Sequence, residues 1–258
     1  MSATSDDKDA KELPLVSHLV ELRDRLIRCV LCVGLVFLAI FYFQNDIFTF
    51  VSEPLAKAMG PGQQMIATKP LDGFLIPLTL TMMVAFFISI PYVMHQIWAF
   101  IAPGLYRNEI RVTLPILVSS VILFYLGVVF CYFAVLPMIF KFSTSTAPEH
   151  VAVMTDISPL YDLEMRMFMV FGIVFEVPVA TVLLILAGAI TPEKLVENRG
   201  YVIIGCFTIG MFLSPPDVFS QSLIAIPMWI LFESGVLAGR ILKRKGDDAE
   251  KAKAEGGN

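Results

Sequence analysis

An acidic residue stands in the middle of a long apolar stretch of this sequence. Glu176 lies in "VFGIVFEVPVAT", two residues before Pro178. A charged carboxylate inside hydrocarbon is costly, so we expect Glu176 to be protonated, paired or facing a wet cavity. Gln221, in a later apolar stretch, is a candidate hydrogen-bond partner. A structural role, as a neutral side chain bonded to a neighbouring helix, stays open beside a functional one.

Two further segments place acids at the edges of apolar stretches. Residues 15–28, "LVSHLVELRDRLIR", carry leucines at helical spacing with Glu21 and Arg23 between them. This pattern predicts an amphipathic helix that lies at the membrane interface before the first span. Residues 96–111, "QIWAFIAPGLYRNEIR", mix aromatic residues with Glu109. Membrane anchoring alone would also account for both segments.

Motifs of enzymes and metal sites are missing from the sequence. It has no HExxH, no GxSxG and no P-loop, and its three histidines are widely separated. We therefore predict a protein that is not an enzyme and that holds no metal and no cofactor. Nucleic-acid binding is not indicated either, because the basic residues follow a membrane topology.

The elements that must position these residues are membrane-spanning helices. The chain has 258 residues, of which 57% are hydrophobic and only 16% charged, and its mean hydropathy is +0.75. A soluble domain of this size cannot bury so much apolar surface, so the sequence predicts a multi-pass, all-α membrane protein. The apolar runs are Leu26–Phe43, Phe74–Ile97, Val112–Leu136, Met167–Ile190 and a region from Tyr201 to Ala238 that Pro215-Pro216 interrupts.

Charge decides how the last apolar region is divided. If it forms two helices, Tyr201–Leu213 and Val218–Ala238, then 15 of the 19 Lys and Arg residues fall on one side of the membrane. The positive-inside rule makes that side cytoplasmic, with both termini on it. We therefore predict six transmembrane helices, the fifth and sixth of them short. Residues 15–240 form the core, between a cytoplasmic tail (1–14) and a disordered cytoplasmic tail (241–258).

Five motifs then appear in an order that resembles a known family. They are "HLVELRDRL", "MIATKPLDGF", "QIWAFIAPGLYRNE", "FGIVFEVPV" and "GMFLSPPDVFSQSLIAIPM". Together they are similar to the TatC family, the C subunit of the twin-arginine protein translocase, along residues 15–240.

This resemblance implies a fold and a function. The fold is a cup-shaped bundle of six helices in the bacterial inner membrane. The function is to recognise twin-arginine signal peptides on folded cargo and to form the core of a Sec-independent translocase driven by the proton-motive force. The implied partners are the signal peptides, the single-span subunits TatA and TatB, membrane lipid and further copies of the chain.

The resemblance also assigns residues. It implies signal-peptide binding at Glu21, Arg23, Phe100, Leu105, Tyr106 and Glu109. It implies an intramembrane polar pair at Glu176 and Gln221, functionally sensitive positions at Pro54 and Asp217, and partner docking at Met211 and Ser214. The chain departs from the family pattern where Ile110 separates Glu109 from Arg111, which leaves the role of the basic neighbours open.

Two other classes of function stay open at this stage. An ion-coupled secondary transporter built around Glu176 would need a mid-membrane acid, but the sequence lacks a convincing inverted repeat. A purely structural membrane scaffold would leave Glu176 and the two interfacial acids without a role.

Overall fold

Helices make up nearly all of the part of the chain that the structure describes. The computed structural model describes residues 6–58, 65–105, 110–145, 155–213 and 218–255, and the side chains of 18–53, 66–100, 114–142, 156–213 and 218–244. Its helices are α1 (Asp6–Ile40), η1 (Phe41–Phe43), α2 (Gln44–Ala58), α3 (Asp72–Leu105), α4 (Ile110–Phe130), η2 (Cys131–Val135), α5 (Leu136–Ser145), α6 (Ile157–Val174), α7 (Val177–Leu186), α8 (Pro192–Glu197), α9 (Arg199–Leu213) and α10 (Val218–Glu255). Strands β1 (Met65–Ile66) and β2 (Thr155–Asp156) form one short parallel pair.

Five described segments are long and apolar enough to cross a membrane, and α9 is a shorter apolar helix. The long segments are His18–Glu53, Asp72–Phe100, Leu114–Phe142, Ile157–Leu186 and Val218–Arg244. The predicted all-helical membrane fold is thereby confirmed. α9 is short as predicted, since its 15 residues span about 22 Å. α10 is not short, because it has 38 residues. The prediction for the sixth helix is therefore wrong, because a hydropathy run ends before its helix does.

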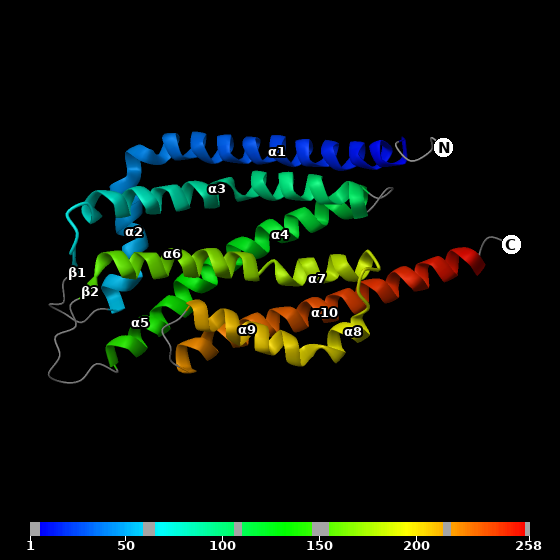
Figure 1. The fold of residues 1–258 in the computed structure, drawn as a ribbon. Helices are drawn as coiled ribbons and strands as arrows, with labels where there is room; N and C mark the ends of the chain where they lie inside the picture. The colour runs from blue at the N-terminus through cyan, green and yellow to red at the C-terminus, as the bar shows by residue number, and fades with distance from the viewer. Residues whose placement is uncertain (1–5, 59–64, 106–109, 146–154, 214–217, 256–258) are drawn as a thin grey trace.

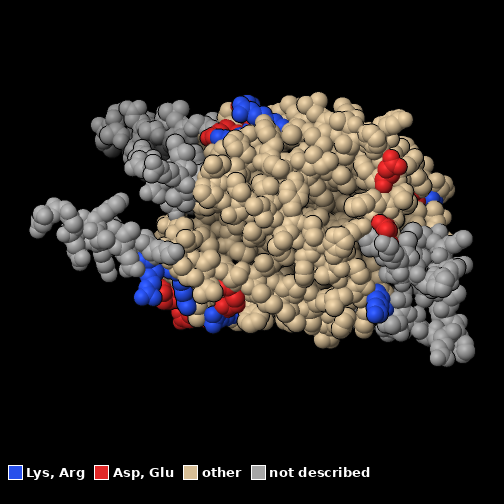
Figure 2. All heavy atoms as spheres, turned by 180° about the vertical axis from the view of Figure 1, so that it is seen from behind, with Lys and Arg blue, Asp and Glu red and all other residues tan. Residues whose placement is uncertain are grey.

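Both described chain ends lie at the same end of the bundle. Figure 1 shows α1 beginning, α3 ending, α4 beginning and α10 ending there, and we call this the terminal end. At the opposite, far end, α2 turns away from α1 and crosses beside α3 and α5. Figure 2 shows a broad band without Lys, Arg, Asp or Glu between charged groups at the two ends. This band matches the chemistry of a hydrocarbon layer.

α1 is one continuous helix from Asp6 to Ile40. The segment 15–28, predicted to lie in the interface as a separate helix, instead runs straight into the first span (Figure 1). α1 packs against α3, and many of its leucines stay exposed, among them Leu31 and Leu35. Exposed leucines on a spanning helix are what a lipid-facing surface requires. α1 and α10 also extend into the predicted tails 1–14 and 241–258, whose division from the core stays a prediction.

The fourth span begins and breaks at residues that local chemistry explains. Asp156 caps α6, because its carboxylate accepts a hydrogen bond from the Ser158 amide at 3.2 Å. Pro178 has no amide proton and lies in the first turn of α7, so the helix is interrupted between Val174 and Val177. The span therefore starts at Ile157 and not at Met167, and Glu176 lies at the interruption.

The core lies where α4 and α6 cross. An added Cβ at Gly127 would lie 2.5 Å from the carbonyl oxygen of Phe171, so only glycine permits this approach. At Gly172 an added Cβ would meet the ring of Phe124 at 2.6 Å. Both contacts hold α6 close to α4 at the level where Glu176 must find its partner.

Candidate functional site: two polar clusters linked by the end of α3

The mid-bundle cluster is built around Glu176. Its Oε2 accepts a hydrogen bond of 2.6 Å from the Ser120 hydroxyl on α4. The Trp98 indole of α3 donates in turn to Ser120 Oγ at 3.1 Å. The other carboxyl oxygen of Glu176, Oε1, is buried and has no partner within the described ranges. Three elements therefore converge on one carboxyl group in the middle of the bundle.

The structure does not bring Glu176 and Gln221 together. Gln221 Nε2 donates to the Phe207 carbonyl at 2.8 Å, which ties α10 to α9. Gly210 allows this approach, because an added Cβ there would lie 3.1 Å from the backbone oxygen of Gln221. The hydrogen bond between Glu176 and Gln221 expected from the sequence is therefore absent among the described contacts, and Ser120 takes its place.

The second cluster lies toward the terminal end, between α1 and α3. The Arg25 guanidinium donates to Glu21 Oε1 through Nη2 at 2.6 Å and through Nε at 2.9 Å. The same guanidinium reaches α3, donating to Gln96 Oε1 and to the Ala99 carbonyl, each at 3.2 Å. Arg25 thus holds a carboxylate on its own helix and the last turns of α3 at once.

An aromatic contact strengthens this junction. The rings of His18 and Phe100 stack with their centroids 4.2 Å apart and 15° between their planes. Arg23 does not join the Glu21 group, since its guanidinium pairs with Asp24 at 2.7 Å on an exposed face. Of the predicted signal-binding residues, the structure therefore places Glu21 and Phe100 at one junction and Arg23 beside it.

The remaining predicted residues are described only in part or not at all. Met211 is exposed on α9. Leu105 ends α3 and Pro54 lies in α2, but their side chains are outside the described set. Tyr106, Glu109, Ser214 and Asp217 lie outside the described residues. The signal-binding, docking and sensitivity roles of all these residues stay predictions.

Sequence reasoning missed a second buried acid, Glu164. Its side chain is fully buried in α6, and neither carboxyl oxygen has a hydrogen-bond partner among the described residues. In the sequence Glu164 stands in "YDLEMRMF", just before the predicted apolar run Met167–Ile190. The signal that could have found it is the helix start at Asp156, followed by Pro159 in the first turn, which extends the helix back past Glu164.

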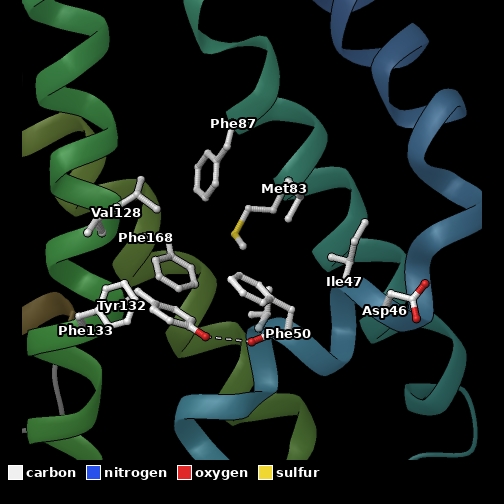
Figure 3. Close-up of a pocket in the computed structure, with 12 residues that line it drawn as sticks. Asp46, Ile47, Phe50, Met83, Phe87, Val128, Tyr132, Phe133 and Phe168 are labelled. Atoms are coloured by element: carbon white, nitrogen blue, oxygen red, sulfur yellow. Dashed lines mark hydrogen bonds between the residues drawn. The ribbon is translucent and has the colours of Figure 1, made fainter.

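An apolar groove opens at the far end between α2, α3, α4, η2 and α6. It has a volume of about 450 Å³, and Phe50, Phe87, Tyr132 and Phe168 point into it (Figure 3). The Tyr132 hydroxyl donates to the Phe50 carbonyl at 3.0 Å, and Asp46 lies at the edge. No cluster of three or more His, Cys, Asp or Glu side chains that could hold a metal occurs among the described residues.

Comparison with known proteins gives a consistent result. Residues 17–227 match the family model described as "Sec-independent protein translocase protein (TatC)". The chain is 53% identical over 236 residues to the TatC protein of Haemophilus influenzae and 50% identical over 237 residues to that of Escherichia coli K12, covering 92% of each chain in both cases.

Solved structures agree. A crystal structure named as the twin-arginine translocase receptor TatC superimposes with a TM-score of 0.78 at 34% identity, covering 87% of this chain and 98% of the other. A second crystal structure, of the same receptor in DDM, gives a TM-score of 0.79 at 35% identity, covering 86% and 99%. An ion-coupled secondary transporter finds no support among these relatives. The chain belongs to the TatC family of Sec-independent protein translocase proteins.

Proposed function

We propose that this chain is the twin-arginine signal receptor of its translocase and that Glu21 is one of the two carboxylates that bind the signal arginines. The other is Glu109, which follows α3 in the sequence. Folded proteins are the cargo, and the proton-motive force drives their passage. The single-span subunits TatA and TatB assemble with this chain at the helix α9, and the complex contains more than one copy.

The observation that supports the proposal is the environment of Glu21. This carboxylate already accepts two hydrogen bonds from a guanidinium, at 2.6 and 2.9 Å, so its position suits the planar group that a signal arginine would bring. It also lies beside the end of α3, the helix that leads to Glu109. Glu109 follows Leu105, the last residue of α3, by four positions in the sequence, and a pair of carboxylates suits two adjacent arginines.

The proposed orientation follows from the distribution of charge. The side that carries 15 of the 19 Lys and Arg residues faces the cytoplasm, so the terminal end lies there. A signal peptide made in the cytoplasm then approaches the end of the bundle toward which Glu21 lies. The membrane is the bacterial inner membrane, since a proton-motive force is maintained across it.

The proposal is tested by signal-peptide binding to variants of the chain in nanodiscs. Each charge-assisted hydrogen bond contributes about 1.5–3 kcal/mol, so Glu21→Ala or Glu109→Ala should weaken binding of an Arg-Arg signal by roughly tenfold or more. Glu193→Ala removes an exposed acid of α8 and serves as the matched control, with unchanged affinity. Unchanged binding by the double variant Glu21→Ala/Glu109→Ala would overturn the assignment.

A further inference from the structure

We propose that Ser120 and Trp98 are positioning residues for Glu176, holding its carboxyl with Oε2 as the acceptor of the Ser120 hydrogen bond and Oε1 as the atom that carries the proton when the group is neutral. The effect of this positioning on transport rests on the proposed function, because it requires that Glu176 acts in transport. We call the chain of hydrogen bonds from Trp98 through Ser120 to Glu176 the relay. The relay can be tested without measuring transport.

The direction of the relay follows from the chemistry of its members. An indole nitrogen can only donate, so Trp98 Nε1–H donates a hydrogen bond to Ser120 Oγ. A serine hydroxyl has one proton, and the 2.6 Å contact with Glu176 Oε2 is where that proton goes. In the structure Oε2 therefore accepts from Ser120. While Oε2 accepts this bond, a protonated Glu176 carries its proton on Oε1.

Ser120 and the Glu176 carboxyl oxygen Oε1 are buried, so water does not replace the hydrogen bonds of the relay. Ser120 is fully buried, so no solvent competes for its hydroxyl. Glu176 Oε1 is also buried and has no donor or acceptor within the described ranges. Ser120 holds one carboxyl oxygen while the other has no described partner, so Oε1 is the single atom left to carry a proton. Pro178 keeps Glu176 at the interruption between α6 and α7, where the side chain can reach α4.

Trp98 also joins this relay to the junction at Glu21. Gln96 and Ala99, the two α3 residues that Arg25 holds at 3.2 Å, flank Trp98 in the sequence. A ligand that takes Glu21 from Arg25 therefore acts on a guanidinium that also contacts the turn of α3 carrying the indole. This gives a continuous physical connection from the recognition carboxylate to the mid-bundle acid through described contacts.

Infrared spectroscopy of the purified chain tests the position of the carboxyl. Glu176→Gln identifies the band of the protonated Glu176 carboxyl, whose C=O stretch reports the hydrogen bond at Oε2. Ser120→Ala should move this band to higher frequency, Trp98→Phe should move it by a smaller amount, and Ser120→Thr should restore it. Ser119→Ala is the matched control, because the exposed hydroxyl of this neighbouring residue donates instead to the backbone carbonyl oxygen of Pro115.

Transport measurements give the functional half of the test. Loss of one hydrogen bond to a buried acceptor predicts a transport rate about three- to tenfold lower for Ser120→Ala. Trp98→Phe should add nothing further in the Ser120→Ala background, and Ser120→Ala should add nothing in the Glu176→Ala background. Ser119→Ala should transport at the wild-type rate.

The outcomes separate the two claims. An unmoved infrared band in Ser120→Ala, or an equal shift in Ser119→Ala, would overturn the positioning role. If Ser120→Ala does not fold, Trp98→Phe tests the same relay, and an unmoved band there would overturn it. Normal transport by Glu176→Ala would overturn the role of Glu176 in the proposed function, while the infrared result would still decide the positioning claim.

Discussion

Replacing Glu164 with methionine should stabilise the protein. The side chain is fully buried, and neither of its carboxyl oxygens has a partner among the described residues. An unsatisfied buried polar group costs about 1–3 kcal/mol. Methionine has a similar length and adapts to irregular space, so it fills the site without the polar cost. We expect Glu164→Met to raise the free energy of unfolding by about 2 kcal/mol, the middle of that range.

Thermal unfolding in detergent micelles is the assay. A gain of about 2 kcal/mol corresponds to a rise in Tm of roughly 4–8 °C for a chain of this size. Glu164→Gln keeps an unpartnered polar group and should gain little. Asp162→Asn changes an exposed acid of the same helix and should shift stability by less than about 0.5 kcal/mol.

A destabilised Glu164→Met variant would refute the reasoning, because it would mean that the carboxyl group has a favourable interaction in the native state. A stabilised variant that no longer transports would keep the energetic argument and add a functional role for the acid. Stability gained at the cost of activity is the usual sign of a polar group retained for function.

Three further predictions concern the crossing of α4 and α6, the Asp156 carboxylate and the orientation of the chain. Gly127→Ala should lower the free energy of unfolding by about 1–3 kcal/mol in the same assay, because its Cβ would lie 2.5 Å from the backbone oxygen of Phe171 where α4 and α6 cross. Gly34→Ala is the control and should leave stability unchanged, because nothing lies within 4 Å of an added Cβ there. The hydrogen bond of 2.6 Å from Thr68 holds the pKa of Asp156 below its usual 3.8. The hydrogen bond from Thr68 to the ionised Asp156 carboxylate stabilises the fold at pH values above 3.8, and this stabilisation is lost as the pH falls through the lowered pKa of Asp156. Thr68→Val should therefore raise the pKa of Asp156 in an NMR titration. A reporter fused after Lys245 should be cytoplasmic, and an external position would contradict the proposed orientation.

Hydropathy and charge in the sequence were enough to predict the spans and the position of Glu176. A long apolar run can satisfy its backbone in a membrane only as a helix, so composition alone predicts the element. Pro178 marks the interruption and therefore where the acid must lie. The boundary of the fourth span was missed because Glu164 and Arg166 lower the local hydropathy, although Asp156 and Pro159 mark the helix start.

Side-chain partners could not be predicted in the same way. Glu176 meets Ser120 because α4 and α6 approach closely at Gly127 and Gly172, and one sequence does not reveal which helices touch. Serine in an apolar helix is common and gives no signal of its own. Arg25 likewise lies among the charged residues of segment 15–28, and nothing in the sequence indicates that it holds Glu21 to the end of α3.

The most direct test of the account is the affinity of the wild-type chain, alone in nanodiscs, for an Arg-Arg signal peptide and for the same peptide carrying Lys-Lys. Lysine has equal charge but lacks the planar fork that a carboxylate binds through two hydrogen bonds. We expect the Arg-Arg peptide to bind and the Lys-Lys peptide to bind about tenfold or more weakly, a difference of at least one charge-assisted bond. Equal affinities, or no binding of the Arg-Arg peptide, would contradict it.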